Sequence, residues 1–350
     1  MTAVVSGAAR LVELAPGDPA WTDFVAAAPE ATVFHHPAWV SALVAAYGYR
    51  PVILAERDED GRISAGLPLI QVRRLSGRAW VSLPFTDCCP PLARDEASMG
   101  LLAEDLAAWS RRQGVPVEVR GELPTTAAWN RATVGTRHIL PLERGVDAAW
   151  DGVRGSIRRH IRGARRASLQ VRFTRRREDM DAFYQLQLAT RRRLGVPVQP
   201  RRFIAALWQH VIEPGLGVVA LAETPTGEAV ATSVMLAWNG TAIEKFQASD
   251  AAHWQTKPNH LVIWATIEWA CEQGAAAFDF GRSDADHTSL QQFKAAWGAE
   301  ELPLRYAVTG GASARAGGDS RLGALLGHVI RRSPDLVCRA LGRALYRYAA

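Results

Sequence analysis

The stretch that decides the fold covers residues 259–308, NHLVIWATIEWACEQGAAAFDFGRSDADHTSLQQFKAAWGAEELPLRYAV. Residues 261–273 are apolar around most of a helical circumference, with Asn259 placed as N-cap and Gly274 placed to end the helix, so they predict a buried helix. Three further elements are predicted after it: a strand over 276–280, a helix over about 288–297 and a strand over 302–308.

Upstream of this stretch the pattern predicts a meander of three strands. Residues 217–223 and 229–236 flank a turn at Pro225-Thr-Gly227, and Asn239-Gly240 is the dipeptide favoured by type I′ hairpin turns. A third strand over 241–248 is therefore expected, and the second half has the order βββαβαβ.

The first half repeats this plan. Strands are predicted over 50–56 and 63–70, and Leu54-Ala-Glu56 and Leu221-Ala-Glu223 lie 167 residues apart in equivalent places. Helices are predicted before each hairpin, over 37–47 in the first half and over 179–194 and 202–212 in the second. A chain of 350 residues is also too long for one ordinary core. We expect two α/β (α+β) domains, residues 1–145 and 146–309, followed by a Gly/Ala-rich linker (310–319) and a basic C-terminal helix within 310–350.

Composition excludes several classes of protein. With 48% hydrophobic and 22% charged residues, the chain is neither disordered nor membrane-spanning, and it has no apolar run of about 18 residues and no signal-peptide pattern. A cytoplasmic location is expected, with peripheral contact at the inner membrane face as an option. The four cysteines show no metal-ligand spacing, so no metal site is expected.

A net charge of +6, carried by clustered arginines, favours an anionic partner. Arg158 and Arg162, with Arg165 and Arg166, share one helical face by their spacing, which suits a polyphosphate backbone or is simply a solvated face. The aromatic residues that interleave basic ones in single-strand readers are missing, so sequence-specific recognition and a DNA partner are not expected. The basic tail, split by Pro334, suits either an anionic membrane or docking on the domain.

Several motifs resemble those of one known family. They are Phe34-His-His-Pro-Ala-Trp39, Ser82-Leu-Pro-Phe-Thr-Asp87, Lys257-Pro-Asn259, Phe278-Asp-Phe-Gly-Arg-Ser-Asp284 and Phe293-Lys-Ala-Ala-Trp-Gly298. Together with the element order, they resemble the FemAB/FemX family of peptidoglycan interpeptide-bridge aminoacyltransferases. The resemblance implies two tandem GNAT (acyl-CoA N-acyltransferase)-like domains, each a mixed, mostly antiparallel sheet flanked by helices. It also implies transfer of an aminoacyl group from aminoacyl-tRNA to an amine of a cell-wall precursor.

The sequence departs from the larger families in two ways. The long helical hairpin of the larger FemAB proteins has no room here. The Gly-rich loop that binds the acetyl-CoA pyrophosphate in ordinary GNAT enzymes is replaced by His253-Trp-Gln-Thr-Lys-Pro-Asn259. We therefore expect aminoacyl-tRNA as co-substrate with no other cofactor, and acyl-CoA is the alternative donor.

Aminolysis of an ester develops an oxyanion, which needs a positive charge or N–H donors. Lys294 is the candidate, since the resemblance places the matching family lysine near the reacting end of the donor; the alternative is a solvated lysine on a surface helix. Asp279 and Asp284 follow or end a strand, where a carboxylate can take a proton from the amine. The alternative for Asp279 is a structural pair with Arg282.

Further residues are candidates for binding. Arg282 suits a phosphate or carboxylate. Lys257 and Asn259 flank a helix N-terminus, where free N–H groups favour an anion. By the resemblance, Phe85 and Asp87 line the acceptor groove; packing of Phe85 into the core is the alternative.

The resulting hypothesis is an acyltransferase that moves an aminoacyl or acyl group to an amine of a cell-wall peptide or a related small or lipid-linked precursor. One alternative is an acyl-CoA-dependent N-acetyltransferase on the same fold. The other is a non-enzymatic module that binds RNA or anionic lipid.

Overall fold

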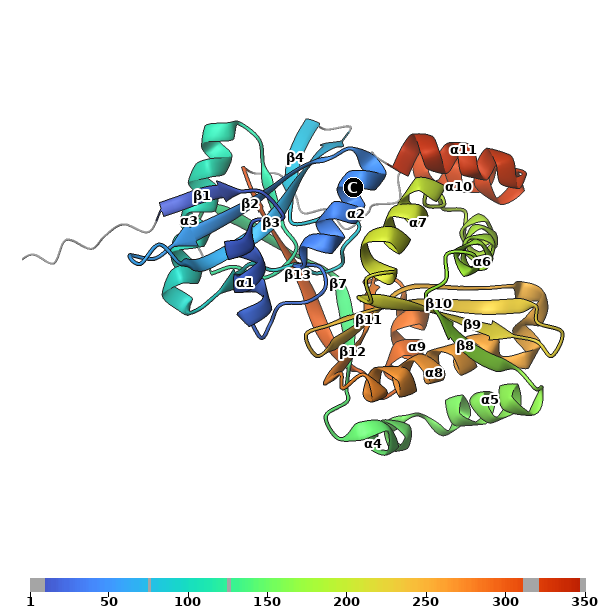
Figure 1. The fold of residues 1–350 in the computed structure, drawn as a ribbon. Helices are drawn as coiled ribbons and strands as arrows, with labels where there is room; N and C mark the ends of the chain where they lie inside the picture. The colour runs from blue at the N-terminus through green and yellow to red at the C-terminus, as the bar shows by residue number, and fades with distance from the viewer. Residues whose placement is uncertain (1–9, 75–76, 125–126, 311–320, 347–350) are drawn as a thin grey trace, which may run out of the picture.

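The computed structural model describes residues 10–74, 77–124, 127–310 and 321–346. The segment predicted as a linker, 310–319, lies outside the described residues apart from Gly310. Within the described parts, a single thirteen-stranded sheet runs through both halves of the chain, with helices packed on its two faces (Figure 1). No helix in these ranges is long and apolar enough to cross a membrane.

The first half confirms the predicted helix over 37–47 and the hairpin that follows it. Its elements are β1 (Arg10–Leu14), α1 (Pro19–Ala27), α2 (Pro37–Tyr47), β2 (Arg50–Arg57), β3 (Ile63–Arg74), β4 (Gly77–Val81), β5 (Leu92–Ala93), α3 (Glu96–Gln113), β6 (Val117–Val119) and β7 (Trp129–Pro141).

The second half confirms the predicted order βββαβαβ. It begins with α4 (Gly145–Gly152), α5 (Gly155–Arg166), β8 (Gln170–Thr174), α6 (Asp179–Leu194), α7 (Arg201–Leu207) and the π-helical turn η1 (Trp208–Ile212). The meander and the elements after it are β9 (Gly217–Glu223), β10 (Ala229–Trp238), β11 (Thr241–Ser249), the 3-10 turn η2 (Ala251–Thr256), α8 (Pro258–Glu272), β12 (Ala277–Ser283), α9 (Thr288–Ala295) and β13 (Glu300–Thr309). Asn239 and Gly240 both have positive φ, as the predicted type I′ turn between β10 and β11 requires.

The two halves share the centre of the sheet. The strand order is β1-β2-β3-β4-β6-β13-β7-β12-β11-β10-β9-β8, so β13, the last strand of the second half, lies between β6 and β7 of the first. The Thr309 hydroxyl fixes this insertion by accepting from the Val117 N–H at 2.9 Å. Strands from before and after residue 145 pair within one sheet. The domain boundary expected at residue 145 stays a prediction.

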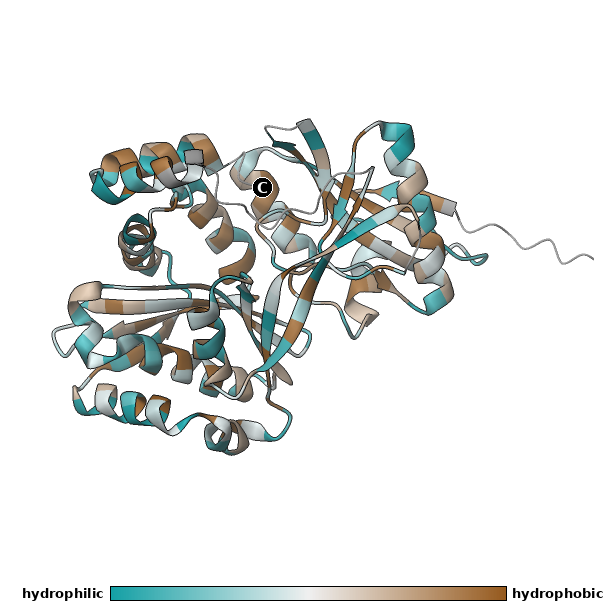
Figure 2. Cartoon of the chain, turned by 180° about the vertical axis from the view of Figure 1, so that it is seen from behind, coloured by the Kyte–Doolittle hydropathy of each residue, from teal (hydrophilic) through white to brown (hydrophobic). Residues whose placement is uncertain are grey.

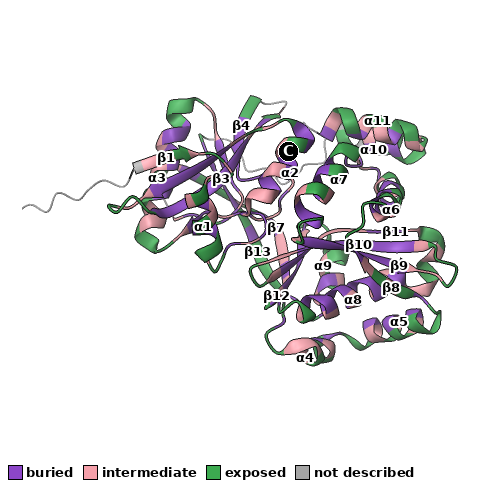
Figure 3. Ribbon diagram, viewed as in Figure 1, coloured by how far each residue is buried: buried purple, intermediate pink, exposed green. Residues whose placement is uncertain are grey.

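Helices cover both faces of the second half of the sheet. On one face α2, α6 and α7 pack into a core that joins the two halves, with Trp39, Phe183 and Phe203 at its centre. On the other face α4, α5 and α8 cover a second core that contains Trp264, Trp269 and Trp297. Figure 3 shows the resulting buried layers on either side of β10 and β11.

The strand pairing of the sheet is interrupted between β11 and β12. These strands pair in parallel only from Thr241 to Ile243, opposite Ala277 to Asp279, and then separate. At the same point β12 shifts its register against β7 between Asp279 and Arg282, with Gly281 at φ 71°. The backbone beyond Ile243 and Asp279 is thus free of sheet pairing between the two strands, and the sheet opens there.

The C-terminal segment forms two helices, α10 (Arg321–Arg332) and α11 (Asp335–Leu345), separated at Pro334 as predicted. Both helices pack on α6. Gly342 of α11 lies so close to Val198 that an added Cβ would overlap the Val198 carbonyl oxygen. Docking on the domain, one of the two outcomes considered for the tail, is therefore confirmed.

Replacing Gly342 with alanine should destabilise the docked α11, by about 1–3 kcal/mol, because the new methyl group meets backbone that cannot move away. The matched control is Gly163→Ala in α5, where a Cβ has no neighbour within 4 Å; the better helix propensity of alanine should add about 0.5–1 kcal/mol. Urea unfolding and hydrogen exchange of α11 measure both. Equal stabilisation by the two substitutions would show that α11 does not dock through Gly342.

Candidate functional site

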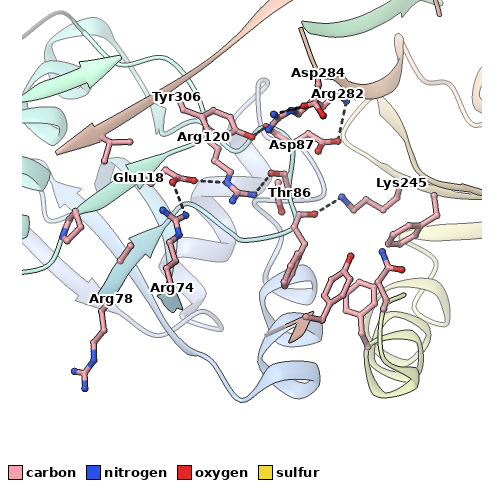
Figure 4. A pocket seen from close by; sticks show the side chains of 18 of the residues that line it. Arg74, Arg78, Thr86, Asp87, Glu118, Arg120, Lys245, Arg282, Asp284 and Tyr306 are labelled. Atoms are coloured by element: carbon pink, nitrogen blue, oxygen red, sulfur yellow. Dashed lines mark hydrogen bonds and ion pairs between the residues drawn. The ribbon is translucent and has the colours of Figure 1, made fainter. Parts of the chain in front are cut away.

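A large cleft lies where the two halves meet, with a volume of about 1330 Å³. Figure 4 shows its walls coming from both halves: Arg74, Arg78, Glu118 and Arg120 of the first half lie on one side, with Tyr306 of β13 beside Arg120, and Lys245 of β11 lies on the other. Six cationic side chains line it against three carboxylates. The cations are Arg74, Arg78, Arg120, Arg191, Lys245 and Arg282, and the carboxylates are Asp87, Glu118 and Asp284. This excess of positive charge suits an anionic ligand.

The loop at residues 82–87 forms the contact between the halves. Phe85 has positive φ (59°), and its carbonyl oxygen accepts from Lys245 Nζ at 2.6 Å. The Thr86 hydroxyl accepts from Trp39 Nε1 at 2.9 Å, and the Thr86 carbonyl accepts from Arg120 Nη1 at 2.8 Å. The backbone of this loop is therefore held by side chains of both halves.

Phe85 packs against the core and also lines the cleft. Its ring is only partly buried and contacts the rings of Tyr47 and Tyr346, with centroids 5.1 Å and 4.9 Å away. Phe85 thus packs on the core, as the alternative had it, and also lines the cleft.

Asp87 is a carboxylate in the cleft surrounded by positive charge. Burial alone would raise the pKa of Asp87, but Lys245, the Arg282 N–H, Lys294 and Arg120 hold it below the ordinary value. Its Oδ2 accepts from the Arg282 N–H at 3.4 Å, so Asp87 bridges the first half to β12 (Figure 4). It is therefore an ionised, fixed acceptor rather than a proton donor.

The predicted pair between Asp279 and Arg282 is wrong. Asp279 Oδ2 instead accepts from Arg137 Nη2 at 2.7 Å, and its Oδ1 accepts from the Gly281 N–H at 2.8 Å. Arg282 Nε donates to Asp284 Oδ1 at 2.8 Å. The turn at Gly281 separates the two side chains, and β7 supplies the nearer guanidinium. Both Asp279 oxygens are thus engaged with the protein, while Arg282 and Asp284 face the cleft.

Lys294 lies in the opening between β11 and β12. It is 7% exposed, so the alternative of a solvated surface lysine is wrong. Its Nζ donates to the carbonyl oxygens of Gly281 and Arg282, both at 2.9 Å. Burial lowers the pKa of Lys294, against the opposing effect of Glu244 and the nearby aspartates. Two of the three ammonium hydrogens are used, which leaves one for a further oxygen.

Glu244 is a titratable group that the sequence analysis missed. It is the first residue of β11 beyond the parallel pairing with β12, and its Oε1 accepts from the Ser233 hydroxyl at 3.0 Å. Burial raises the pKa of Glu244 to about 7, although the Ser233 hydrogen bond and Lys294 lower it. A carboxylate with such a pKa can both accept and release a proton near neutrality.

Other missed residues line the cleft from distant parts of the sequence. They are Arg74, Arg78, Arg120, Arg191, Lys245, Tyr306 and Tyr346. The hydroxyl of Tyr306 donates to the Asp87 carbonyl at 2.8 Å, and the Tyr346 ring stacks on that of Tyr47. Of these residues, only the arginines at the end of β3 could have been found from the sequence, because they form a basic run directly after an apolar strand.

The N-terminus of α8 differs from the prediction. Lys257, with φ 60°, is the N-cap and the helix begins at Pro258, so the assignment of Asn259 as N-cap is wrong. The αL conformation of Lys257 turns the chain into the helix two positions earlier than a capping asparagine at 259 would. No side chain caps this end. Neither Lys257 nor Asn259 lines the cleft between the halves.

Aromatic side chains fill the space beside this helix end. His260 Nε2 lies 3.2 Å from His160 Nδ1 of α5, and the His260 ring contacts those of Phe293 and Trp297. At the predicted anion site the His260 and Leu261 N–H groups both donate to the Lys257 carbonyl, and aromatic rings lie beside the helix end.

The basic face of α5 is separate from the cleft. Arg162 lies over the Trp150 ring at 5.6 Å, and Arg158 approaches Asp151 at 3.9 Å. The helix lies on the outer side of α8, away from the first half (Figure 1). Arg158 and Arg162 therefore do not join the other candidate residues.

Two groups could in principle share a cation. Asp284, Asp286 and His287 form one, and Glu228, Asp250 and His253 the other. Glu228, Asp286 and His287 are exposed, and Asp284 already binds Arg282. We propose no metal site at either group.

Comparison with known proteins agrees with this architecture. The acetyltransferase (GNAT) domain family matches residues 152–294, while no curated protein matches the sequence. Among solved structures, FemX has a TM-score of 0.68 at 14% identity, covering 85% of this chain and 96% of FemX.

Two other structures share the fold. The C-terminal domain of a putative lysylphosphatidylglycerol synthetase from Agrobacterium fabrum has a TM-score of 0.56 at 14% identity, covering 89% of this chain and 95% of that domain. A tandem GNAT protein from the clavulanic acid biosynthesis pathway has a TM-score of 0.50 at 16% identity, covering 87% of this chain and all (100%) of that one. At such identities the likeness establishes the fold. The chain thus has a tandem GNAT fold of FemX-like architecture, and residues 152–294 in its second half match the acetyltransferase (GNAT) domain family.

Proposed function

We propose that this protein transfers an aminoacyl group from aminoacyl-tRNA to an amine of an anionic acceptor bound between the two halves. The observation that carries the proposal is the cation-rich cleft, built by both halves, beside the opening between β11 and β12. Glu244 and Lys294 are not among the side chains that line the cleft, but Glu244 precedes the lining residue Lys245 on β11, and Lys294 Nζ donates to the carbonyl of the lining residue Arg282. An acceptor held by the arginines of the cleft would bring its amine to this wall. A cell-wall peptide precursor has the required charge and amine.

The chemistry is an aminolysis. The amine nitrogen attacks the ester carbonyl carbon, a C–N bond forms, and the carbonyl oxygen becomes an oxyanion. Glu244 takes the proton that the attacking nitrogen loses, because its pKa of about 7 matches that task. The C–O bond then breaks, and Glu244 returns the proton to the departing ribose oxygen, so the carboxylate is regenerated.

Lys294 supplies the positive charge for the oxyanion in this proposal. Its Nζ is fixed by the carbonyls of Gly281 and Arg282, with one ammonium hydrogen left over. Being buried, it interacts with a developing charge through a medium of low dielectric constant. Asp279 has a positioning role, since it binds the Gly281 N–H and so shapes the turn that holds Lys294.

Two observations support aminoacyl-tRNA as the donor. The arginines of α5, including the half-buried Arg158 and the exposed Arg162, form a second basic surface that suits an RNA backbone. The name of the Agrobacterium relative also refers to a lysyl-bearing product, and a lysyl group is an aminoacyl group.

An acyl-CoA donor is the second candidate. The N-terminus of α8 has no side-chain cap, and its positive dipole end would favour a phosphate, although the His260 and Leu261 N–H groups already donate to the Lys257 carbonyl. The name given to the clavulanic acid pathway structure also refers to AcCoA. The two donors differ in the bond that is broken, an ester in one and a thioester in the other.

Donor consumption separates these candidates. The full chain, incubated with a UDP-linked muramoyl peptide bearing a free lysine amine, should consume radiolabelled aminoacyl-tRNA mixtures faster than the same reaction without the acceptor. Acetyl-CoA, followed through release of its thiol, should stay intact. Thiol release without loss of aminoacyl ester would favour the second candidate, and loss of neither would contradict both.

The rate should rise as pH increases through about 7, because only the ionised Glu244 accepts a proton. Glu244→Gln should lower the rate about a hundredfold or more and remove this acidic limb. The isosteric Gln also gives a readout that needs no substrate. The folded protein binds the proton of Glu244 more tightly than the unfolded chain does. The free energy of unfolding of wild type should therefore fall relative to that of the variant as pH rises from about 4.5 to about 7. An acidic limb that persists in the variant would exclude Glu244 as the base.

Lys294→Ala should lower the rate about a hundredfold, the usual effect of losing one oxyanion donor. It also removes two hydrogen bonds to buried carbonyls, so the free energy of unfolding should be measured alongside. Lys294→Arg is the matched variant, since it keeps the charge in a changed shape. An alanine variant within about threefold of wild type would contradict the oxyanion role.

A further inference from the structure

The two C-terminal helices have one face on the domain and another face left exposed. On the inner face, Ile330 and Cys338 are buried, and Leu326 and Leu341 pack partly against the core. α6 is the element that they cover. The helices are therefore fixed to the second half as a pair, outside residues 152–294 that match the acetyltransferase family.

The outer faces of α10 and α11 carry large apolar side chains. Leu325 is 61% exposed and Leu336 is 76% exposed, with Val329 and Val337 also exposed beside them. Figure 3 shows exposed positions along both helices, on the side away from α6. A monomer does not usually expose such a group of apolar residues without a partner.

Positive charge accompanies these apolar residues. Leu325, Val329 and Arg332 of α10 are spaced four and three residues apart, so they share one helical face. Leu336, Ala340 and Arg343 of α11 repeat that spacing. Figure 2 shows alternating apolar and hydrophilic positions along the two helices.

α10 and α11 together carry more positive than negative charge. Arg331, Arg332, Arg339 and Arg343 lie on the described parts of the two helices, whereas the carboxylate of Asp335 is bound to Arg192 at 2.9 Å. Arg331 donates to the Leu194 carbonyl and Arg339 to the Gln185 amide oxygen, both neutral acceptors, so neither charge is neutralised. An apolar stripe bordered by uncompensated arginines fits an anionic lipid surface better than it fits water.

The end of α11 also reaches the cleft. Tyr346 follows its last residue, and its ring lines the cleft and contacts those of Tyr47 and Phe85. A surface bound through α10 and α11 would thus lie next to the cleft.

We propose that α10 and α11 form a peripheral membrane-binding surface for anionic phospholipid. Leu325, Val329, Leu336 and Val337 enter the interface, and Arg332 and Arg343 bind lipid phosphates. If the proposed acyl transfer is correct, the cleft then receives an acceptor presented at the bilayer. The binding itself is independent of that reaction, so its test does not rely on the acceptor or the donor.

The test is sedimentation of the full chain with vesicles of phosphatidylcholine, alone or with about one quarter phosphatidylglycerol. We expect binding only to the anionic vesicles and weaker binding at high ionic strength. Arg332→Gln with Arg343→Gln should lower the partition coefficient about fivefold per arginine. Leu325→Ser with Leu336→Ser should lower it about tenfold or more.

Matched controls lie on α3, far from these helices. Leu101 is 48% exposed, and Arg111 is also exposed; Leu101→Ser and Arg111→Gln should leave vesicle binding unchanged. All substitutions are of exposed residues, so unfolding temperatures should stay close to that of wild type.

Three results would overturn the proposal. The first is absence of binding to the anionic vesicles. The second is binding that survives the changes on α10 and α11 but is lost on Arg158→Gln with Arg162→Gln, which would assign it to α5. The third is a dimer in analytical ultracentrifugation that Leu325→Ser with Leu336→Ser dissociates while vesicles do not bind, which would make this face an interface between two copies.

Discussion

The separation of β11 and β12 after three residue pairs is the constraint on which the site depends. Strands that separate leave buried backbone groups without partners, and such groups must be satisfied elsewhere. Here side chains do so. Asp279 accepts from the Gly281 N–H, and Lys294 donates to the Gly281 and Arg282 carbonyls. Asp279 and Lys294, which satisfy the backbone where the sheet opens, therefore also place a carboxylate and an ammonium group at the opening.

The position of β13 extends this arrangement to the first half. Because β13 lies between β6 and β7, its Tyr306 binds the Asp87 backbone, and Asp87 in turn accepts from the Arg282 N–H. Lys245 closes the contact through the Phe85 carbonyl. The relative placement of the halves, and with it the shape of the cleft, is thus fixed by hydrogen bonds to the turn at Gly281 and to the strands beside it.

Local signals predicted most elements and few of the partners. Asn239-Gly240 fixes a hairpin through its own backbone preferences, so the meander was predictable. The partner of Asp279 was not, because Arg137 is 142 residues away and reaches it only through the pairing of β12 with β7. The same holds for Glu244, whose raised pKa comes from burial that a single strand does not reveal. Lys294 was named through the family resemblance, and its hydrogen bonds to two carbonyls were visible only in the structure.

The positive charge of the cleft favours the binding of an anion. Cations held close together repel one another, and only Glu118, shared by Arg74 and Arg120, and Asp284, bound to Arg282, offset them by direct ion pairs among the described residues that line it. Burial lowers the pKa of Lys245, and Arg120 and Arg191 add to this effect, although Asp87 and Asp279 raise the pKa. An anion would relieve this repulsion, and each cation would gain a partner. The arrangement therefore favours anion binding at the cost of stability in the empty protein.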